Sequence, residues 1–274
     1  MSLRPTDELR AHWDAFAACF ARAFEPVTLQ LCLSLSEALR PGEARAVLEV
    51  GAGAGGGAEL LRRGLRPGAR HVVTDLSPAM VALARERLAG PLSRGEATVE
   101  VADLERLPFG AGEFDRVLAN LVLMLVPDPA VALAEVRRVL APGGRLALSV
   151  WGRREESPMF TLPPLAAERV GRPEEPGRRS NFHLNDPGRL RDLLQAAGFA
   201  RVVTWHQAAV LPVEDGADFA ARVGLTPGWR EHFAGAPPEQ ARAFERELAA
   251  LADARLAAGR PIAIDALMAV ARAV

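Results

Sequence analysis

"VLEVGAGAGGGAEL", residues 47–60, is the stretch that decides the fold. Apolar residues surround one acid, Glu49, and are followed by glycines at positions 51, 53, 55, 56 and 57 and then by a helix-like run. This order predicts a buried strand, a tight turn and the start of a helix. So many glycines at one turn indicate that a small molecule approaches the backbone closely there.

On the carboxyl side of this stretch, apolar strand patterns alternate with amphipathic helix patterns. Strands are predicted at 45–50, 70–76, 97–104, 114–125, 145–152, 199–211 and 261–274, and helices at 57–65, 77–90, 128–144 and 186–198. The clearest end signals are Ser77 before Pro78 at a helix start and "LAPGG" at a helix stop. The alternation predicts an α/β fold: a doubly wound, Rossmann-like, mostly parallel seven-stranded sheet with helices on both faces.

Three segments stand outside the alternation. Residues 1–40 read as two helices and form a predicted N-terminal helical cap, with the main domain over 41–274. Within that domain, 153–185 and 214–260 are predicted insertions, the second of them helical, which act as lids. Excursions from a rigid sheet are where substrate pockets are usually built.

Composition excludes several kinds of chemistry. All 33 basic residues are Arg and the chain has no Tyr, so Lys-based Schiff bases, the Walker lysine and the Tyr–Lys pair of short-chain dehydrogenases are ruled out. The formal net charge of −1 argues against a nucleic-acid partner. Cys19 and Cys32 lie in apolar helix patterns and read as reduced core thiols. With no signal core and no apolar run near membrane-spanning length, we expect a cytoplasmic protein without a membrane partner.

The glycine stretch permits two interpretations. "GAGAGG", residues 51–56, fits the pattern of dinucleotide sites, in which a helix N-terminus holds a pyrophosphate and Asp75 binds ribose hydroxyls. Glu49, only two residues upstream, disfavours a pyrophosphate and favours a cofactor with positive charge. S-adenosylmethionine, with its ammonium and sulfonium groups, meets that requirement.

The motifs that follow appear in a family's order. "EVGAGAG" is an acid followed by three alternate glycines, "TDLSPAMVALAR" has an acid at the end of strand two, and "VADLERLPF" has an acid after strand three. "FDRVLANLVLMLVPD" and "AEVRRVLAPGGRLALSVWG" correspond to strands four and five. In these motifs the chain resembles the class I S-adenosylmethionine-dependent methyltransferases, of the small-molecule type near the ubiquinone and menaquinone biosynthesis group. The resemblance covers residues 44–152 and, more weakly, 181–212.

The resemblance implies a cofactor site of eleven residues. Glu49 and the loop would face the methionine part, Asp75 the ribose, Leu76 and Met80 the adenine faces, and Asp103 with the Leu104 amide the adenine edge. Asn120 would lie by the methionine part or the acceptor. The full set is Glu49, Gly51, Ala52, Gly53, Gly55, Asp75, Leu76, Met80, Asp103, Leu104 and Asn120.

The reaction expected is methyl transfer to a small organic acceptor through O, N, C or S. His183 and His12 are the candidate general bases, whereas His206 and His232 read as structural. Phe16, Phe20, Phe24, Trp151, Phe160, Phe182, Trp229 and Phe233 would line an apolar pocket, and Arg153, Arg154, Arg178 and Arg179 would suit an acidic acceptor. No metal site is expected, and a homodimer stays open. The alternatives are a nicotinamide-dependent oxidoreductase and a binding protein that keeps the cofactor but not the catalysis.

Overall fold

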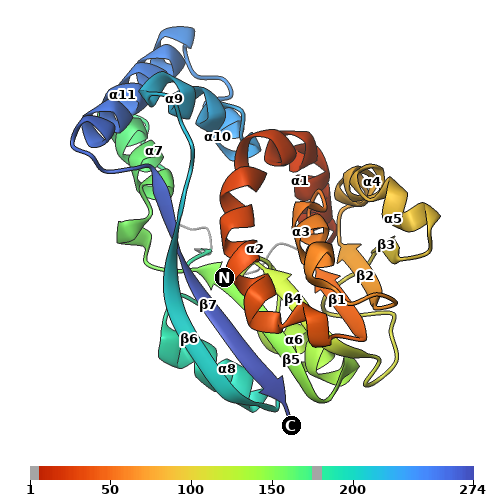
Figure 1. The fold of residues 1–274 in the computed structure, drawn as a ribbon. Helices are drawn as coiled ribbons and strands as arrows, with labels where there is room; N and C mark the ends of the chain where they lie inside the picture. The colour runs from red at the N-terminus through yellow and green to blue at the C-terminus, as the bar shows by residue number, and fades with distance from the viewer. Residues whose placement is uncertain (1–5, 175–180) are drawn as a thin grey trace.

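The computed structural model describes residues 6–174 and 181–274 and contains one seven-stranded sheet in the order β3-β2-β1-β4-β5-β7-β6 (Figure 1). The strands are β1 Ala46–Val50, β2 Arg70–Asp75, β3 Ala97–Val101, β4 Phe114–Asn120, β5 Leu140–Trp151, β6 Phe199–Val210 and β7 Ala263–Ala273. β7 runs antiparallel to both β5 and β6, and the pairs from β3 to β5 are parallel. The predicted doubly wound, mostly parallel sheet is therefore confirmed.

Helices cover both faces of the sheet (Figure 1). They are α1 Thr6–Cys19, the π-helix η1 Phe20–Phe24, α2 Glu25–Leu39, the 3-10 helix η2 Pro41–Glu43, α3 Gly56–Gly64, α4 Pro78–Arg87, α5 Ala89–Ser93, α6 Pro129–Val139 and α8 Pro187–Ala196. α2 and α3 lie on one face, and α6 and α8 lie on the other. Because the order reverses at β1, the turn after β1 opens at a switch point, where α/β sheets bind ligands.

The predicted insertions form a separate helical layer beyond one edge of the sheet (Figure 1). It consists of η3 Arg154–Glu156, α7 Pro158–Arg169, α9 Gly216–Gly224, α10 Pro227–His232 and α11 Pro238–Ala257. η3 and α7 follow β5, whereas α9, α10 and α11 connect β6 to β7, so the layer is joined to three neighbouring strands of the sheet.

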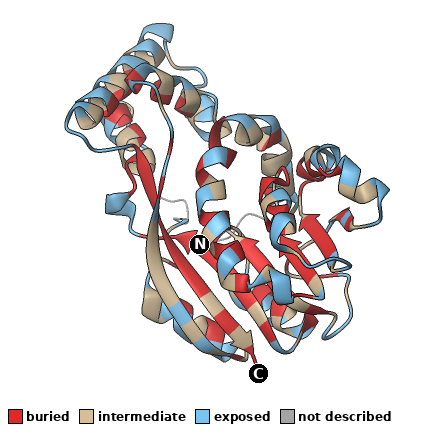
Figure 2. Cartoon of the chain, viewed as in Figure 1, coloured by how far each residue is buried: buried red, intermediate tan, exposed pale blue. Residues whose placement is uncertain are grey.

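The core follows the central strands, where buried residues form a continuous band, while the outer helices expose their far sides (Figure 2). In α2, Val27, Leu31, Leu35 and Leu39 are fully buried. Within the described residues, the helical run Thr6–Leu39 is long and apolar enough to cross a membrane, with a mean hydropathy of 1.2 in its 18-residue window. Since 44% of that window is buried inside the molecule, its apolar side serves the core. The expectation that no apolar run approaches membrane-spanning length was therefore wrong for this helical run.

Two predicted boundaries were wrong. The strand expected over 114–125 ends at Asn120, because Leu121 adopts a left-handed φ of 55° and the following apolar residues are buried in a turn. The helix expected over 128–144 ends at Val139, and "LAPGG" begins β5. In the first of these places, burial in a turn rather than strand periodicity explains apolar Leu123 and Met124.

Candidate cofactor and acceptor site

The glycine turn after β1 has the backbone that its sequence predicts. Gly51, Gly53 and Gly55 have φ values of 61°, 57° and 83°, in the left-handed region that favours glycine. A Cβ on Gly51 would lie 2.5 Å from Val122 Cγ2, and one on Gly53 would lie 3.1 Å from Phe20 Cε1. Both conformation and crowding therefore require glycine, and Gly55 leads directly into α3.

Asp75 ties the turn after β1 to the turn after β2. Its Oδ2 accepts from the Gly53 amide at 2.8 Å, and its Oδ1 accepts from the Ser77 amide at 2.9 Å. Burial raises the pKa of the Asp75 carboxyl, and these backbone hydrogen bonds oppose the rise. The Leu76 amide is a third backbone donor, so about one of the four lone pairs of the carboxylate remains for a ribose hydroxyl. Leu76 follows in the turn, and Met80 is buried in the first turn of α4.

An acid that the sequence did not single out fastens α1 over these turns. Asp14 Oδ1 accepts from the Ser77 hydroxyl at 2.5 Å and from the Ala79 amide at 3.0 Å. Ala17 of α1 packs in one cluster with Ala54 and Met80, flanked by Trp13 and Phe20. The N-terminal segment thus covers the glycine turn directly. No local pattern distinguishes Asp14 from a surface acid.

Glu49 lies beneath the first turn of α3 with an unusual lack of partners. It is 3% exposed, its Oε2 has no hydrogen-bond partner, and its Oε1 lies 2.5 Å from where a Cβ on Gly57 would stand. Burial raises the pKa of the Glu49 carboxyl to about 8, with the carboxylates of Glu25 and Asp75 acting in the same direction. An unpaired buried carboxyl of this kind is expected where a cationic ligand completes the site.

Glu25, in the same region, differs from Glu49 because both of its carboxylate oxygens have partners. Its Oε1 accepts from the Gly56 amide at 3.1 Å, and its Oε2 pairs with Arg87 at 2.7 Å. Glu25 therefore caps the N-terminus of α3 from α2 and is already neutralised. This contact, too, was missed by sequence reasoning, because its partners lie far along the chain.

Asp103 lies in a surface cavity of about 330 Å³ at the end of β3, together with Arg10 of α1. Its Oδ1 accepts from the Glu105 amide at 2.9 Å, and Leu104 beside it is buried. Asn120, at the end of β4, donates to the Thr28 carbonyl at 3.1 Å and accepts from the Ser149 hydroxyl at 2.7 Å. The structure thus brings the loop, Asp75 and Glu49 together, and it places Asp103 and Asn120 at the same edge of the sheet with partners of their own.

The four histidines of interest lie in different surroundings. His12 packs against Trp13 and Phe16 in α1, with ring centroids 5.8 and 6.2 Å away. His183 is half-buried just before α8. His206 Nδ1 lies 2.7 Å from Asp265 Oδ2, and His232 Nε2 lies 2.9 Å from the Arg172 carbonyl, so both have the structural partners expected for them. Within residues 6–174 and 181–274, no group of three His, Cys, Asp or Glu side chains is arranged to hold a metal ion.

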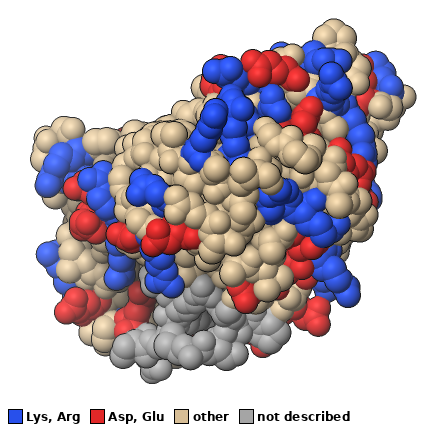
Figure 3. Space-filling model, turned by 90° about the horizontal axis from the view of Figure 1, so that it is seen from below, with Lys and Arg blue, Asp and Glu red and all other residues tan. Residues whose placement is uncertain are grey.

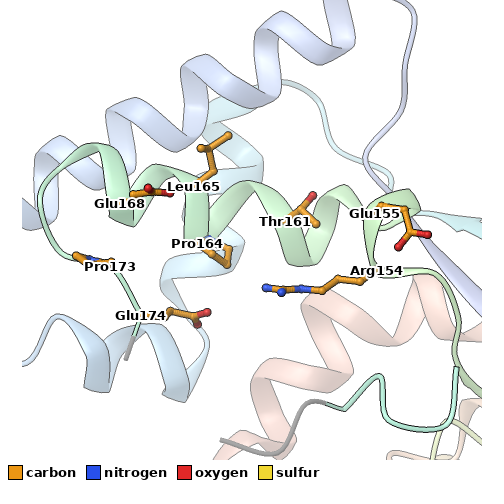
Figure 4. A pocket seen from close by; sticks show the side chains of 8 residues that line it. All are labelled: Arg154, Glu155, Thr161, Pro164, Leu165, Glu168, Pro173 and Glu174. Atoms are coloured by element: carbon orange, nitrogen blue, oxygen red, sulfur yellow. The ribbon is translucent and has the colours of Figure 1, made fainter. Parts of the chain in front are cut away.

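A larger cavity of about 560 Å³ lies beside α7 (Figure 4). Arg154 extends along it below Thr161 and Pro164, but Glu155, Glu168 and Glu174 line it as well. Its lining includes no residue of the glycine turn. Arg153 is engaged with Asp265, and Arg178 and Arg179 lie outside the described residues. The cavity therefore carries no cationic field of its own.

Aromatic rings line the base of the helical layer. Trp151, Phe160 and Phe182 form a ladder with centroid separations of 4.9 and 5.4 Å, all edge to face. Phe16 contacts both Phe20 and Phe24 on the N-terminal side. Trp229 and Phe233 stack instead on Phe244 inside the layer. On the face seen in Figure 3, arginines and acids are interspersed, without a broad field of one sign.

Comparisons with known proteins agree with this geometry. Residues 48–148 match the family described as "Methyltransferase domain". The chain is 34% identical over 189 residues to trans-aconitate 2-methyltransferase of Variovorax paradoxus, covering 68% of this chain and 70% of that protein. It is 37% identical over 110 residues to the ubiquinone/menaquinone biosynthesis C-methyltransferase UbiE of Geobacter sulfurreducens, spanning 40% of this chain and 43% of that protein.

Among solved structures, the crystal structure of the [4+2]-cyclase SpnF superposes with a TM-score of 0.62 at 17% identity, over 100% of this chain and 98% of that one. This likeness concerns the fold, whereas the family match over residues 48–148 includes the glycine turn, Glu49, Asp75 and Asp103. The chain belongs to the S-adenosylmethionine-dependent methyltransferases, and its cofactor is S-adenosylmethionine.

Proposed function

We propose that the protein transfers a methyl group to a small organic acceptor, in a pocket that the N-terminal helices and the helical layer close. The observation that carries the proposal is the buried Glu49 carboxyl, whose Oε2 has no hydrogen-bond partner, beside a turn whose glycines admit no side chain. A buried carboxyl gains from ionising only beside a positive charge, so this site favours a cationic ligand over a pyrophosphate. It therefore supports methyl transfer over the oxidoreductase alternative.

Each residue of the cofactor site would have one role. Glu49 would face the positive end of the cofactor, Asp75 would accept from the ribose hydroxyls, and the Asp103 region would receive the adenine edge. Leu76 and Met80 would bound the adenine faces, and Asn120 would lie toward the acceptor. When bound, S-adenosylmethionine supplies an electrophilic methyl group on its sulfonium. The chain's contribution is to orient the two reactants and to exclude water.

The acceptor proposed is small, and at least partly apolar or aromatic. The Trp151–Phe160–Phe182 ladder supports an apolar wall at the end of β5, and the relatives named above act on trans-aconitate or in quinone biosynthesis. A screen of phenols, quinols, thiols, amines and polycarboxylates with methyl-deuterated cofactor, read by mass spectrometry, identifies both the acceptor and its atom. The proposal fails if no class gains the labelled methyl group.

Calorimetric titration with S-adenosylhomocysteine and, separately, with NADH tests the cofactor site. Asp75→Ala should weaken S-adenosylhomocysteine about 100-fold, because the turn loses its anchor and the ribose its acceptor. Asp192→Ala, exposed on α8, is the matched control and should bind like the wild type. A preference for NADH in the wild type would overturn the methyltransferase proposal.

His183 and His12 are proposed as candidate general bases for acceptors that must lose a proton. His183→Gln or His12→Gln should then lower kcat more than KM and remove the acid limb of the pH–rate profile. An unchanged profile in both variants would assign the proton to the acceptor itself.

A cytoplasmic location belongs to the same proposal and is supported by two free thiols, Cys19 and Cys32. The division into a cap over 1–40 and a main domain over 41–274 remains a prediction. So does a homodimer, which light scattering on the purified chain would test.

A further inference from the structure

Two buried ionisable side chains on the neighbouring strands β1 and β2 have polar atoms without hydrogen-bond partners. Glu49 is 3% exposed, and His71, on the neighbouring strand β2, is 1% exposed. Glu49 Oε2 and both ring nitrogens of His71 lack partners. The gap between His71 Nε2 and Glu49 Oε2 is 3.8 Å, too long for a hydrogen bond. The two groups face one another, but the contact is not made.

The charged and titratable neighbours leave Glu49 without a cation. From α2, Glu25 is already paired with Arg87 at 2.7 Å, and burial keeps the Cys32 thiol protonated by raising its pKa. From α3, Arg62 pairs with Glu96 at 2.5 Å. From β2, Asp75 adds negative charge. Among the described residues, therefore, nothing that packs against Glu49 supplies a free positive charge to it.

The same surroundings hold both groups in their neutral forms. Burial raises the pKa of Glu49 to about 8 and lowers the pKa of His71 to about 3, and Arg62 also lowers that of His71. Near neutral pH, the protein without ligand thus holds a protonated carboxyl beside a neutral imidazole. Neither carries charge until a charged ligand arrives.

We propose that Glu49 and His71 form a charge-sensing pair that favours the cationic cofactor over its product. The inference rests on the proposed function, in which Glu49 faces the positive end of the cofactor. When that charge binds, the Glu49 O–H bond breaks and its proton leaves to the solvent. The neutral imidazole then donates its Nε2–H to the new carboxylate and closes the 3.8 Å gap. After methyl transfer the sulfur is uncharged, so the carboxyl regains its proton and the product is held less tightly.

Calorimetry of the full chain with S-adenosylmethionine and S-adenosylhomocysteine, in phosphate and in Tris, counts the protons that each ligand releases. Both ligands carry the same amino acid group, so the difference reports on the sulfonium. At about pH 7, one unit below the pKa of Glu49, S-adenosylmethionine should release close to one proton and S-adenosylhomocysteine clearly less. Equal proton counts for the two ligands would overturn the inference, and this comparison needs only the wild type.

Substitutions test whether the proton released on binding of S-adenosylmethionine comes from Glu49. Glu49→Gln should abolish the difference in proton release and reduce the preference for the cationic ligand about tenfold, the equivalent of one pKa unit. His71→Asn should reduce the same preference less, because only the donor to the carboxylate is lost. Glu59→Gln, on the exposed side of α3, is the control. A proton count unchanged by Glu49→Gln would refute the assignment. If neither ligand binds the wild type, the proposed function itself fails. If both ligands bind with equal proton release, only the charge-sensing pair is refuted and the proposed function stands.

Discussion

Two acids with the same 3% exposure, Glu49 under the glycine turn and Asp265 at the base of the helical layer, have opposite surroundings. Asp265 accepts from the Arg153 amide at 2.7 Å and from the Arg153 guanidinium at 3.0 Å, and it contacts His206 Nδ1 at 2.7 Å. Although burial would raise the pKa of Asp265, its hydrogen bonds with Arg153 and His206 hold it below the usual value. Glu49 has a raised pKa and an oxygen without a partner.

The difference separates a carboxyl that builds the fold from one that waits for a ligand. Asp265 links the end of β5 to the beginning of β7 at the base of the helical layer, because Arg153 lies just after β5 and Asp265 is the third residue of β7. The Ser157 hydroxyl accepts from the Asp265 amide at 2.9 Å and adds η3 to the same junction. Burial alone therefore does not identify a functional acid. A buried carboxyl that lacks hydrogen-bond donors from the protein is the one that indicates a ligand site.

Removing the satisfied acid should cost the most stability. Asp265→Ala is expected to lower the free energy of unfolding by about 3 kcal/mol, since it removes the buried carboxylate that accepts from the Arg153 amide and guanidinium and contacts His206. Urea unfolding at neutral pH measures this loss. Asp253→Ala, which removes the cap on the Gly216 amide within the layer, should cost less. A smaller loss for Asp265→Ala than for Asp253→Ala would contradict the structural role.

Replacing the unsatisfied acid should instead change the pH dependence of stability. Because the folded state holds the Glu49 proton up to about pH 8 while a free carboxyl loses it near 4.5, wild-type stability falls as pH rises between these values. Relative to Glu49→Gln, the wild type should lose about 2 kcal/mol between roughly pH 6.5 and 8.

The pH range of this measurement also separates the two members of the buried pair. His71 acts with the opposite sign, from about pH 3 to 6.5, so measurements above 6.5 isolate Glu49. Chemical unfolding at several pH values measures the slope. Parallel curves for wild type and Glu49→Gln would show that Glu49 is ionised in the free protein.

The smallest effect is expected where the N-terminal segment meets α4. Ser77→Ala removes the hydroxyl that accepts from the Met80 amide at 3.1 Å and donates to Asp14. The loss of this helix cap should cost about 1 kcal/mol. Thermal unfolding measures it, and Ser93→Ala, at the exposed end of α5, is the control. An equal effect of the two variants would remove the case for a specific anchor between α1 and α4.

The sequence predicted those parts of the structure that neighbouring residues in the chain determine. The glycine turn, the N-cap Ser77 and the strand–helix alternation follow from residues that adjoin one another, and Glu49 and Asp75 were found because each borders a turn. Asp14, Glu25 and His71 could not be found in this way. Their partners Ser77, Gly56 and Glu49 lie 63, 31 and 22 positions away, so only helix and strand packing brings them together.

The five-residue π-helix Phe20–Phe24 fixes how Asp14 and Glu25 are phased about a single helical axis. One carboxyl reaches the start of α4 and the other the start of α3, so the angle between them must match two fixed targets. A π turn absorbs one extra residue, and deleting that residue would rotate everything before it by about 100°. Such a deletion would leave Glu25 in place but turn Asp14 away from Ser77. The π-helix thus sets the angle between Asp14 and Glu25 about the helix axis. A change of even one residue in the length of this segment would separate one of these carboxylates from its target.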